Sequence, residues 1–233
     1  MKAMILAAGR GERMRPLTDT TPKPLLRVGG KSLIERHLER LAAAGFQDVV
    51  INHAHLGERL IEALGDGSRW GISIAWSAEP PGALETAGGI AQALPLLGPD
   101  PFLVLSGDIL CEWDFTRAPA LAQRLARAGA HLVLTANPED HPGGDFSLDG
   151  ATLRPAIAGK ALTYANIGVF SPAFFAPVKP GQFLKLRPLL DAAIADGRIT
   201  GEEYHGRWHN IGTPELLARC ERDLEAESRA EST

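Results

Sequence analysis

The residues best suited to chemistry in this 233-residue chain are gathered near its start. An apolar run from Met4 leads into a glycine loop, Gly9-Arg-Gly-Glu-Arg13, with Arg15 close behind, and Lys23 follows between two prolines. Glycines let backbone N–H groups come close to an anion, and arginine grips phosphate oxygens with paired hydrogen bonds. Prolines stiffen the segment around Lys23, so little entropy is lost in aiming its ammonium group. The pattern predicts a binding site for phosphate groups.

Two better-known phosphate loops do not account for this segment. The dinucleotide pattern G-x-G-x-x-G needs a glycine at position 14, where Met14 stands. Gly30-Lys-Ser32 imitates the end of a P-loop, but Leu25 replaces the first glycine of that pattern and no buried strand leads directly into it. An ordinary strand-to-helix turn is the remaining alternative, and the cluster of cations around the loop weighs against it.

Asp108 is the candidate metal ligand. It follows an apolar run of strand length and Gly107. A lone aspartate at a strand end is commonly a cap or turn residue. Beside a triphosphate, however, a carboxylate is a natural ligand for Mg²⁺, and the metal would neutralise charge on the reacting phosphates. We therefore expect Mg²⁺ as a cofactor.

Apolar runs of strand length alternate with helical patterns through the first half of the chain. This alternation predicts an α/β fold: a Rossmann-like, mostly parallel sheet flanked by helices. Ligands bind outside the carboxyl ends of the strands in such sheets, where the glycine loop and Asp108 both fall. The expected strands are 4–7, 49–52, 72–76, 102–105 and 131–136, and the expected helices are 32–44, 56–64, 86–94 and 119–128.

The pattern changes after Gly143, where glycine, proline and short alternating runs dominate up to Phe170. We expect a small antiparallel section covering the mouth of the sheet. A helix over 183–195, an extended segment over 204–211, a charged helix over 214–227 and a frayed polar tail over 228–233 should follow. The chain should form one domain, 1–233, divided into a core (1–140), the antiparallel section (141–213) and the C-terminal helix and tail (214–233).

Composition narrows the class of partner. The formal net charge is -4 and no basic run stands out, which argues against nucleic acid as a partner. Cys111 and Cys220 match no metal-ligand spacing, and reduced thiols indicate a cytoplasmic protein. No signal peptide and no run long enough to span a membrane is expected.

The motifs together resemble those of the sugar-1-phosphate nucleotidyltransferases. The N-terminal signature runs from Leu6-Ala-Ala-Gly to Pro22-Lys-Pro-Leu25. Leu84-Glu-Thr-Ala-Gly-Gly89, Ser106-Gly-Asp108 and Trp208-His-Asn-Ile-Gly-Thr213 support it in the same order. The resemblance covers nearly the whole chain and is greatest to the branch that transfers uridylyl groups to N-acetylmuramate α-1-phosphate in bacterial cell-wall recycling. It implies the nucleotide-diphospho-sugar transferase fold, with 1–140 binding the nucleotide and 141–213 binding the sugar.

The resemblance also implies a reaction and its residues. A nucleoside triphosphate, expected to be UTP, and a sugar-1-phosphate give a nucleotide-sugar and pyrophosphate. Arg13 would hold the leaving phosphates, Lys23 would neutralise the α-phosphoryl group, and Asp108 would anchor Mg²⁺. The remaining candidates are Ala7, Ala8, Gly9, Gly11, Ala83 and Gly88 for the nucleotide, and Glu85, Asn166 and Gly168 for the sugar.

One position departs from the family pattern. Asn210 stands where the family commonly has a second metal-binding aspartate, so the metal site loses a unit of negative charge. Three interpretations stay open: Asp108 and the triphosphate suffice for Mg²⁺, Asn210 binds a sugar hydroxyl, or turnover is weak. Asn210 is retained as a metal candidate.

Several alternatives remain for substrate and assembly. A hexose or heptose 1-phosphate guanylyl- or thymidylyltransferase is the nearest alternative enzyme, and a nucleotide-sugar-binding module without turnover is the alternative outside enzymes. The lactyl carboxylate of N-acetylmuramate calls for a cation, and Lys160, Lys185 and Arg207 are available. A monomer and a homodimer are both compatible with the sequence.

Overall fold

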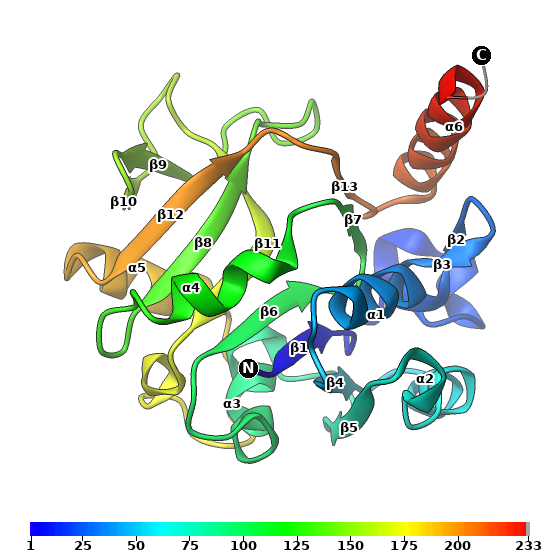
Figure 1. The fold of residues 1–233 in the computed structure, drawn as a ribbon, viewed down its shortest axis with the longest axis horizontal. Helices are drawn as coiled ribbons and strands as arrows, with labels where there is room; N and C mark the ends of the chain where they lie inside the picture. Colours follow the sequence, from blue (N-terminus) through cyan, green and yellow to red (C-terminus); the bar gives the residue numbers. More distant parts are fainter. Residues whose placement is uncertain (232–233) are drawn as a thin grey trace.

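Most of the expected elements are present in the computed structural model, which describes residues 1–231. Within these residues a nine-stranded sheet has the order β5-β4-β1-β6-β11-β8-β12-β10-β9 (Figure 1). Its strands are β1 (Ala3–Leu6), β4 (Asp48–His53), β5 (Ser73–Ala78), β6 (Phe102–Ser106), β8 (Ala130–Thr135), β9 (Phe146–Asp149), β10 (Thr152–Pro155), β11 (Thr163–Phe170) and β12 (Ile199–Tyr204). Two short ribbons pair β2 (Arg27–Val28) with β3 (Lys31–Ser32) and β7 (Ile109–Cys111) with β13 (Trp208–Asn210).

The strand directions confirm a mostly parallel α/β sheet. Strands β5, β4, β1 and β6 are parallel neighbours, and β8 and β12 form another parallel pair. Strand β11 runs antiparallel between β6 and β8, and β10 runs antiparallel between β12 and β9. The section after Gly143 was expected to cover the mouth of the sheet. Its strands instead extend the sheet itself, because β11 pairs with Phe102–Leu105 of β6.

Helices cover both faces of the sheet. They are α1 (Leu33–Ala43), α2 (Gly57–Leu64), α3 (Glu85–Leu97), α4 (Ala118–Ala122), α5 (Arg187–Ala195) and α6 (Pro214–Glu231). Alternate residues of β1 belong to different cores: Ile5 packs with α1, α2 and α4, whereas Met4 packs with α3 and α5. This alternation is the two-residue period of a strand with both faces buried.

A third, smaller core lies beneath α6, beside the N-terminal loop. Cys220 of α6 is fully buried there and joins Met14, Leu33 and Ile211. Helix α1 begins here with a capping box, in which Ser32 and Glu35 satisfy each other's backbone N–H groups. Helix α6 is longer than expected and continues through Glu231, so the tail predicted over 228–233 is helical as far as the structure describes it.

Two more helix boundaries differ from the expectation by four residues or more. Helix α4 ends at Ala122 instead of 128, because the N–H groups of Arg124 and Leu125 bond three residues back, to the carbonyls of Leu121 and Ala122, and the four-residue pattern of an α-helix does not continue. Helix α5 begins at Arg187 instead of 183. The backbone of Leu184 is engaged elsewhere: its carbonyl accepts hydrogen bonds from the N–H groups of Ala87 and Gly88 at 3.0 and 3.1 Å.

No helix in the described part of the chain is long and apolar enough to cross a membrane.

Candidate nucleotidyl-transfer site

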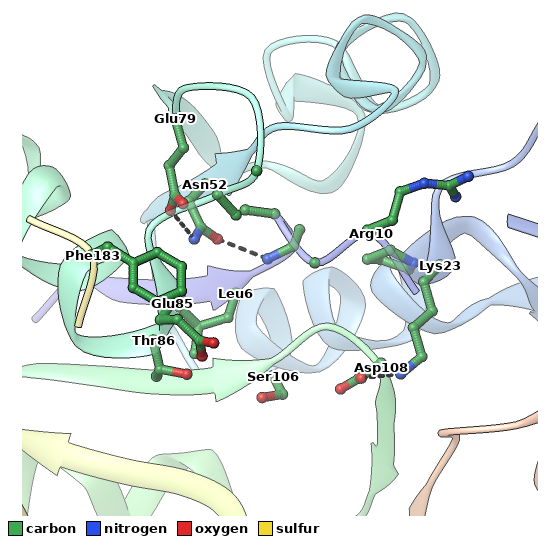
Figure 2. Close-up of a pocket in the computed structure, with 16 residues that line it drawn as sticks. Leu6, Arg10, Lys23, Asn52, Glu79, Glu85, Thr86, Ser106, Asp108 and Phe183 are labelled. Atoms are coloured by element: carbon green, nitrogen blue, oxygen red, sulfur yellow. Dashed lines mark hydrogen bonds and ion pairs between the residues drawn. The ribbon is translucent and has the colours of Figure 1, made fainter. Parts of the chain in front are cut away.

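A chain of hydrogen bonds fixes the start of the glycine loop. Asn52, at the end of β4, accepts from the backbone N–H of Ala7 at 2.7 Å through Oδ1 and donates to Glu79 at 2.6 Å through Nδ2 (Figure 2). Glu79 follows β5 and accepts a second hydrogen bond from the N–H of Leu84 at 2.7 Å. Burial raises the pKa of Glu79, although these two hydrogen bonds oppose the shift. Loops after three parallel strands are thus tied together at one end of the sheet.

Gly11 shapes the loop by its backbone. Its φ is 70°, and its carbonyl accepts hydrogen bonds from the N–H of Met14 at 2.9 Å and the hydroxyl of Thr18 at 2.8 Å. A Cβ at Gly11 would lie 2.9 Å from the Thr18 side chain. Arg10 is held over this turn by the Thr18 carbonyl at 2.8 Å and Asp19 at 3.0 Å. The tight turn therefore requires glycine at position 11.

Lys23 and Asp108 meet although they are far apart in the chain. Their ammonium and carboxylate groups form an ion pair, with the two side chains 12% and 27% exposed. Asp108 also accepts a backbone hydrogen bond from Ile211 at 3.0 Å, which brings the 208–213 segment alongside. Positive and negative charge are therefore concentrated at the carboxyl end of β6.

The first cavity, of about 360 Å³, opens between these loops. In Figure 2, Lys23 and Asp108 lie at one end of it, and Glu79 and Phe183 lie toward the other. The lining residues are Leu6, Ala7, Ala8, Gly9, Arg10, Lys23, Pro24, Asn52, Glu79, Gly82, Ala83, Glu85, Thr86, Ser106, Asp108 and Phe183.

A second cavity, of about 530 Å³, adjoins the first over β6, β11 and the start of α5. Four residues line both cavities: Leu6, Glu85, Thr86 and Ser106. Asn166, Lys185 and Asn210 line the second cavity alone. The arrangement can hold two ligands that touch each other across a shared boundary.

Three residues that line the cavities have strained backbones. Ala83, Glu85 and Asn166 have φ values of 59°, 61° and 57°, in the left-handed region that side chains other than glycine rarely adopt. Ala83 lines the first cavity, Asn166 the second and Glu85 both. Such strain persists where the surrounding structure enforces it and is common at ligand sites.

Comparison with known proteins identifies the chemistry of this architecture. A family model described as nucleotidyl transferase matches residues 2–144. The chain belongs to the nucleotidyl transferase family. It is 54% identical over 216 residues to an N-acetylmuramate alpha-1-phosphate uridylyltransferase from Neisseria meningitidis serogroup B, covering 91% of this chain and 94% of the relative. These matches confirm the family expected from the motifs and an enzyme of the sugar-1-phosphate nucleotidyltransferase type.

Other relatives of this nucleotidyltransferase are similar over most of its length. It is 38% identical to an N-acetylmuramate alpha-1-phosphate uridylyltransferase from Caulobacter vibrioides, over 95% of this chain and 96% of the relative. A crystal structure of a putative glucose-1-phosphate thymidylyltransferase from Bacillus anthracis superimposes with a TM-score of 0.83 at 23% identity, covering 95% of this chain and 94% of that one. That structural likeness confirms the fold.

The structure brings most of the expected site residues of the nucleotidyltransferase together. Ala7, Ala8, Gly9, Lys23, Ala83, Glu85 and Asp108 line the first cavity, and Glu85, Asn166 and Asn210 line the second. Arg13 lies outside both linings, exposed, with its guanidinium 3.1 Å from where a Cβ on Gly212 would lie.

Three expected glycines lie outside the two linings. Gly11 forms the turn described above. Gly88 faces the backbone of Gln182, whose carbonyl oxygen is 2.1 Å from the position of a Cβ. Gly168 packs against Leu132 and Phe170 within the sheet, and a Cβ there would lie 3.0 and 2.8 Å from their side chains. Close packing explains the absence of a side chain at Gly88 and Gly168, and their roles in ligand binding stay predictions.

Several residues of the site were not among the candidates predicted from the sequence. Asn52 and Glu79 position the glycine loop, and Thr86, Ser106 and Phe183 line the cavities. Polar residues at the carboxyl ends of β4 and β5 were a usable signal for the first two. Phe183 had no such signal, because its segment has a helical pattern in the sequence.

The expected metal ligands fit a magnesium ion by their chemistry. Asn210 pairs with Ile109 across the β7–β13 ribbon, which places it next to Asp108. Together they offer carboxylate and amide oxygens, the donors that Mg²⁺ prefers. No cluster of three or more His, Cys, Asp or Glu side chains suited to a metal occurs in the described part of the chain. A cation here would take the rest of its ligands from water and phosphate oxygens, as Mg²⁺ usually does.

Proposed function

We propose that this nucleotidyltransferase joins UTP to N-acetylmuramate α-1-phosphate and releases pyrophosphate. The observation that carries the proposal is the 54% identity over 91% of the chain to the Neisseria uridylyltransferase of that name. The two adjoining cavities support it, because the reaction needs a nucleotide and a sugar phosphate in contact. We place UTP in the first cavity and the sugar phosphate in the second.

The chemistry requires little beyond positioning and charge neutralisation. A phosphate oxygen of the sugar would form a bond to the α-phosphorus of UTP, and the bond from that phosphorus to the β-phosphate oxygen would break. The attacking phosphate is already anionic at neutral pH, so no general base is needed. Holding the two anions in line and neutralising their charge would supply the rate.

Four residues have a proposed part in this transfer. Lys23 would neutralise the α-phosphoryl group, and Arg13 would hold the leaving phosphates beside Gly212. Asp108 and Asn210 would hold Mg²⁺, which supplies positive charge to the phosphates when bound. Asp108 and Lys23 already form an ion pair, so the ammonium is oriented toward the metal ligands.

Lys185 is the candidate for recognising the lactyl carboxylate. It lines the second cavity and forms no hydrogen bond or ion pair of its side chain with the residues that the structure describes. Arg207 faces a different cavity and pairs with Glu112 at 3.0 Å and with Glu227, and Lys160 lines neither ligand cavity. We therefore propose Lys185 as the residue that selects an acidic sugar.

A substrate panel tests the proposal. The wild-type protein is offered UTP, GTP, dTTP, CTP and ATP, each with several sugar-1-phosphates, and pyrophosphate release is measured. We expect the highest kcat/KM for UTP with N-acetylmuramate α-1-phosphate. Preference for GTP or dTTP with a neutral hexose or heptose phosphate would favour the alternative enzyme. Binding of nucleotide-sugar without pyrophosphate release would favour a binding module.

The proposed substrates also suggest a pathway and a cellular compartment for the protein. We infer a role in peptidoglycan recycling in the cytoplasm, where Cys111 and Cys220, both free and buried, stay reduced. Size-exclusion chromatography with light scattering distinguishes the monomer from the homodimer.

A further inference from the structure

Phe183 is the most exposed large hydrophobic residue in the described part of the chain. Its side chain is 62% exposed, compared with 53% for Ile157 and 40% for Leu17. It lines the first cavity and not the second. A single exposed apolar side chain is ordinary on a protein surface. An aromatic ring at the wall of a ligand cavity offers a flat face to whatever binds there.

The backbone on both sides of Phe183 is fixed. The next residue, Leu184, donates a hydrogen bond to the carbonyl of Leu84 at 3.0 Å and accepts two from the first turn of α3. The preceding residue, Gln182, lies so close to Gly88 that its carbonyl occupies the space where a side chain would start. We call Gln182–Lys185 the strap. Because the strap is held at both ends of Phe183, little entropy is lost when a ligand contacts the ring.

The positions of the charged side chains in the first cavity indicate which part of a bound nucleotide would lie next to the strap. The ion pair of Lys23 and Asp108 lies at the opposite end of the cavity (Figure 2). Phe183 shares its end with two carboxylates, Glu85 and Glu79, and the oxygens of Glu79 are occupied by Asn52 and Leu84 (Figure 2). Phosphates belong at the cationic end, so the base and ribose extend toward Phe183.

We propose that Phe183 is a nucleoside-binding residue whose ring covers the base of the bound triphosphate. Stacking suits any base, because every base has a π face. The ring would also exclude water from one side of the cavity. This inference rests on the proposed function for the identity of the nucleotide, and on the strap for the position of the ring.

Titration calorimetry with two probes tests this role in the intact protein. Phe183→Ala should weaken the binding of UTP about tenfold, in the range found for loss of one base–aromatic contact. Binding of inorganic tripolyphosphate should change less than twofold, because it has no base. Phe183→Tyr should restore UTP binding to within twofold of wild type. Ile157→Ala is the matched control, since it removes another exposed apolar side chain that lines neither cavity.

Three outcomes would overturn the inference. UTP affinity of Phe183→Ala within twofold of wild type would mean that the ring does not touch the nucleotide. An equal loss of UTP and tripolyphosphate binding would mean that the strap had moved. A rise in KM for the sugar phosphate alone would assign the ring to the other substrate. If wild type binds another triphosphate in place of UTP, the uridylyl assignment fails, and the same variants titrated with that nucleotide still test Phe183.

Discussion

Lys23 and Asp108 form an ion pair across 85 residues of sequence, at the end of β6 where the two cavities approach each other. Both side chains are largely shielded, at 12% and 27% exposure. A charge pair shielded from water interacts more strongly than one on the surface. The pair therefore holds both groups in place for the phosphate and Mg²⁺ contacts proposed above.

Lys23→Met should abolish turnover. We expect kcat to fall at least about a hundredfold, because one preorganised charge at the reacting phosphate is worth that much in other enzymes. Pyrophosphate release under saturating substrates measures it. Lys31→Met is the control, since Lys31 pairs with Glu39 on the surface, and it should keep wild-type kcat. Activity of Lys23→Met close to wild type would exclude Lys23 from the chemistry.

Asn210→Asp should change the magnesium dependence. A second carboxylate beside Asp108 adds negative charge to the proposed cation site, so half-maximal activity should come at a lower Mg²⁺ concentration. UTP binding without metal should stay nearly intact. The measurement is a magnesium titration of initial rates for both proteins. Superimposable titration curves would show that position 210 is not a metal ligand.

Lys185→Met should reduce selectivity for the acidic sugar. We expect kcat/KM for N-acetylmuramate α-1-phosphate to fall about tenfold and that for N-acetylglucosamine 1-phosphate, which lacks the lactyl carboxylate, to stay unchanged. Lys160→Met is the matched control, because Lys160 lines neither ligand cavity. An equal loss for both sugars would mean that Lys185 contacts a group common to them.

Gly88→Ala should displace the strap. The new methyl group would lie 2.1 Å from the carbonyl oxygen of Gln182, so the two backbones must separate. We expect unfolding free energy to fall by about 1–3 kcal/mol, as for other overpacked sites, together with a rise in KM for UTP. Gly143→Ala, where nothing lies within 4 Å of the added Cβ, is the control for thermal unfolding and kinetics. A variant that keeps wild-type stability and KM would argue against a rigid strap.

Glu202→Gln should lower stability at neutral pH. Burial alone would raise the pKa of Glu202, but nearby His131, the hydrogen bond from Trp113 at 2.7 Å and the paired bonds from Arg117 at 2.8 and 2.6 Å outweigh it and lower the pKa to about 2. We expect a loss of about 1–3 kcal/mol at pH 7, measured by urea unfolding. Glu203→Gln, on the same strand, should have little effect.

The pH dependence follows from the direction of that shift. The pKa of Glu202 is lower in the folded state than its ordinary value of 4.5, so the folded protein binds fewer protons there. The stabilisation is present above pH 4.5 and is lost as the pH falls toward 2. The stability difference between wild type and Glu202→Gln should shrink over that range. His37, whose pKa burial lowers to about 4, destabilises both proteins between pH 6.5 and 4 and cancels in the comparison.

The sequence predicted the first half of the fold well because its signals are local. The buried runs that became β1, β4 and β6 are short and bounded by glycines or polar residues, and Ser32 with Glu35 marks the start of α1. The carboxyl-end rule for parallel sheets then places the glycine loop and Asp108 together without further information.

The predictions that were wrong concern segments whose structure depends on residues far away in the sequence. The segment from Phe183 has a helical pattern, but Leu184 forms backbone hydrogen bonds with α3 nearly a hundred residues earlier in the chain, so α5 starts later. The place of β11 inside the sheet is likewise a matter of tertiary pairing with β6 and β8. The sequence pointed to candidate residues on loops that follow strands. The place of Phe183, in contrast, depends on how its segment packs against the start of α3, and hydrophobic periodicity does not predict that contact.

The position of β8 has a consequence for how the chain acquires its structure. The family match ends at residue 144, after β8 has been made, yet both neighbours of β8 in the sheet, β11 and β12, come later. All six residues of β8 are buried in the finished protein. A chain stopped at 144 would leave β8 unpaired and β6 with an open apolar edge, the kind of surface that aggregates. The half proposed to bind the triphosphate is therefore not expected to fold as a separate module, and during synthesis its sheet is completed only after the other half has been made.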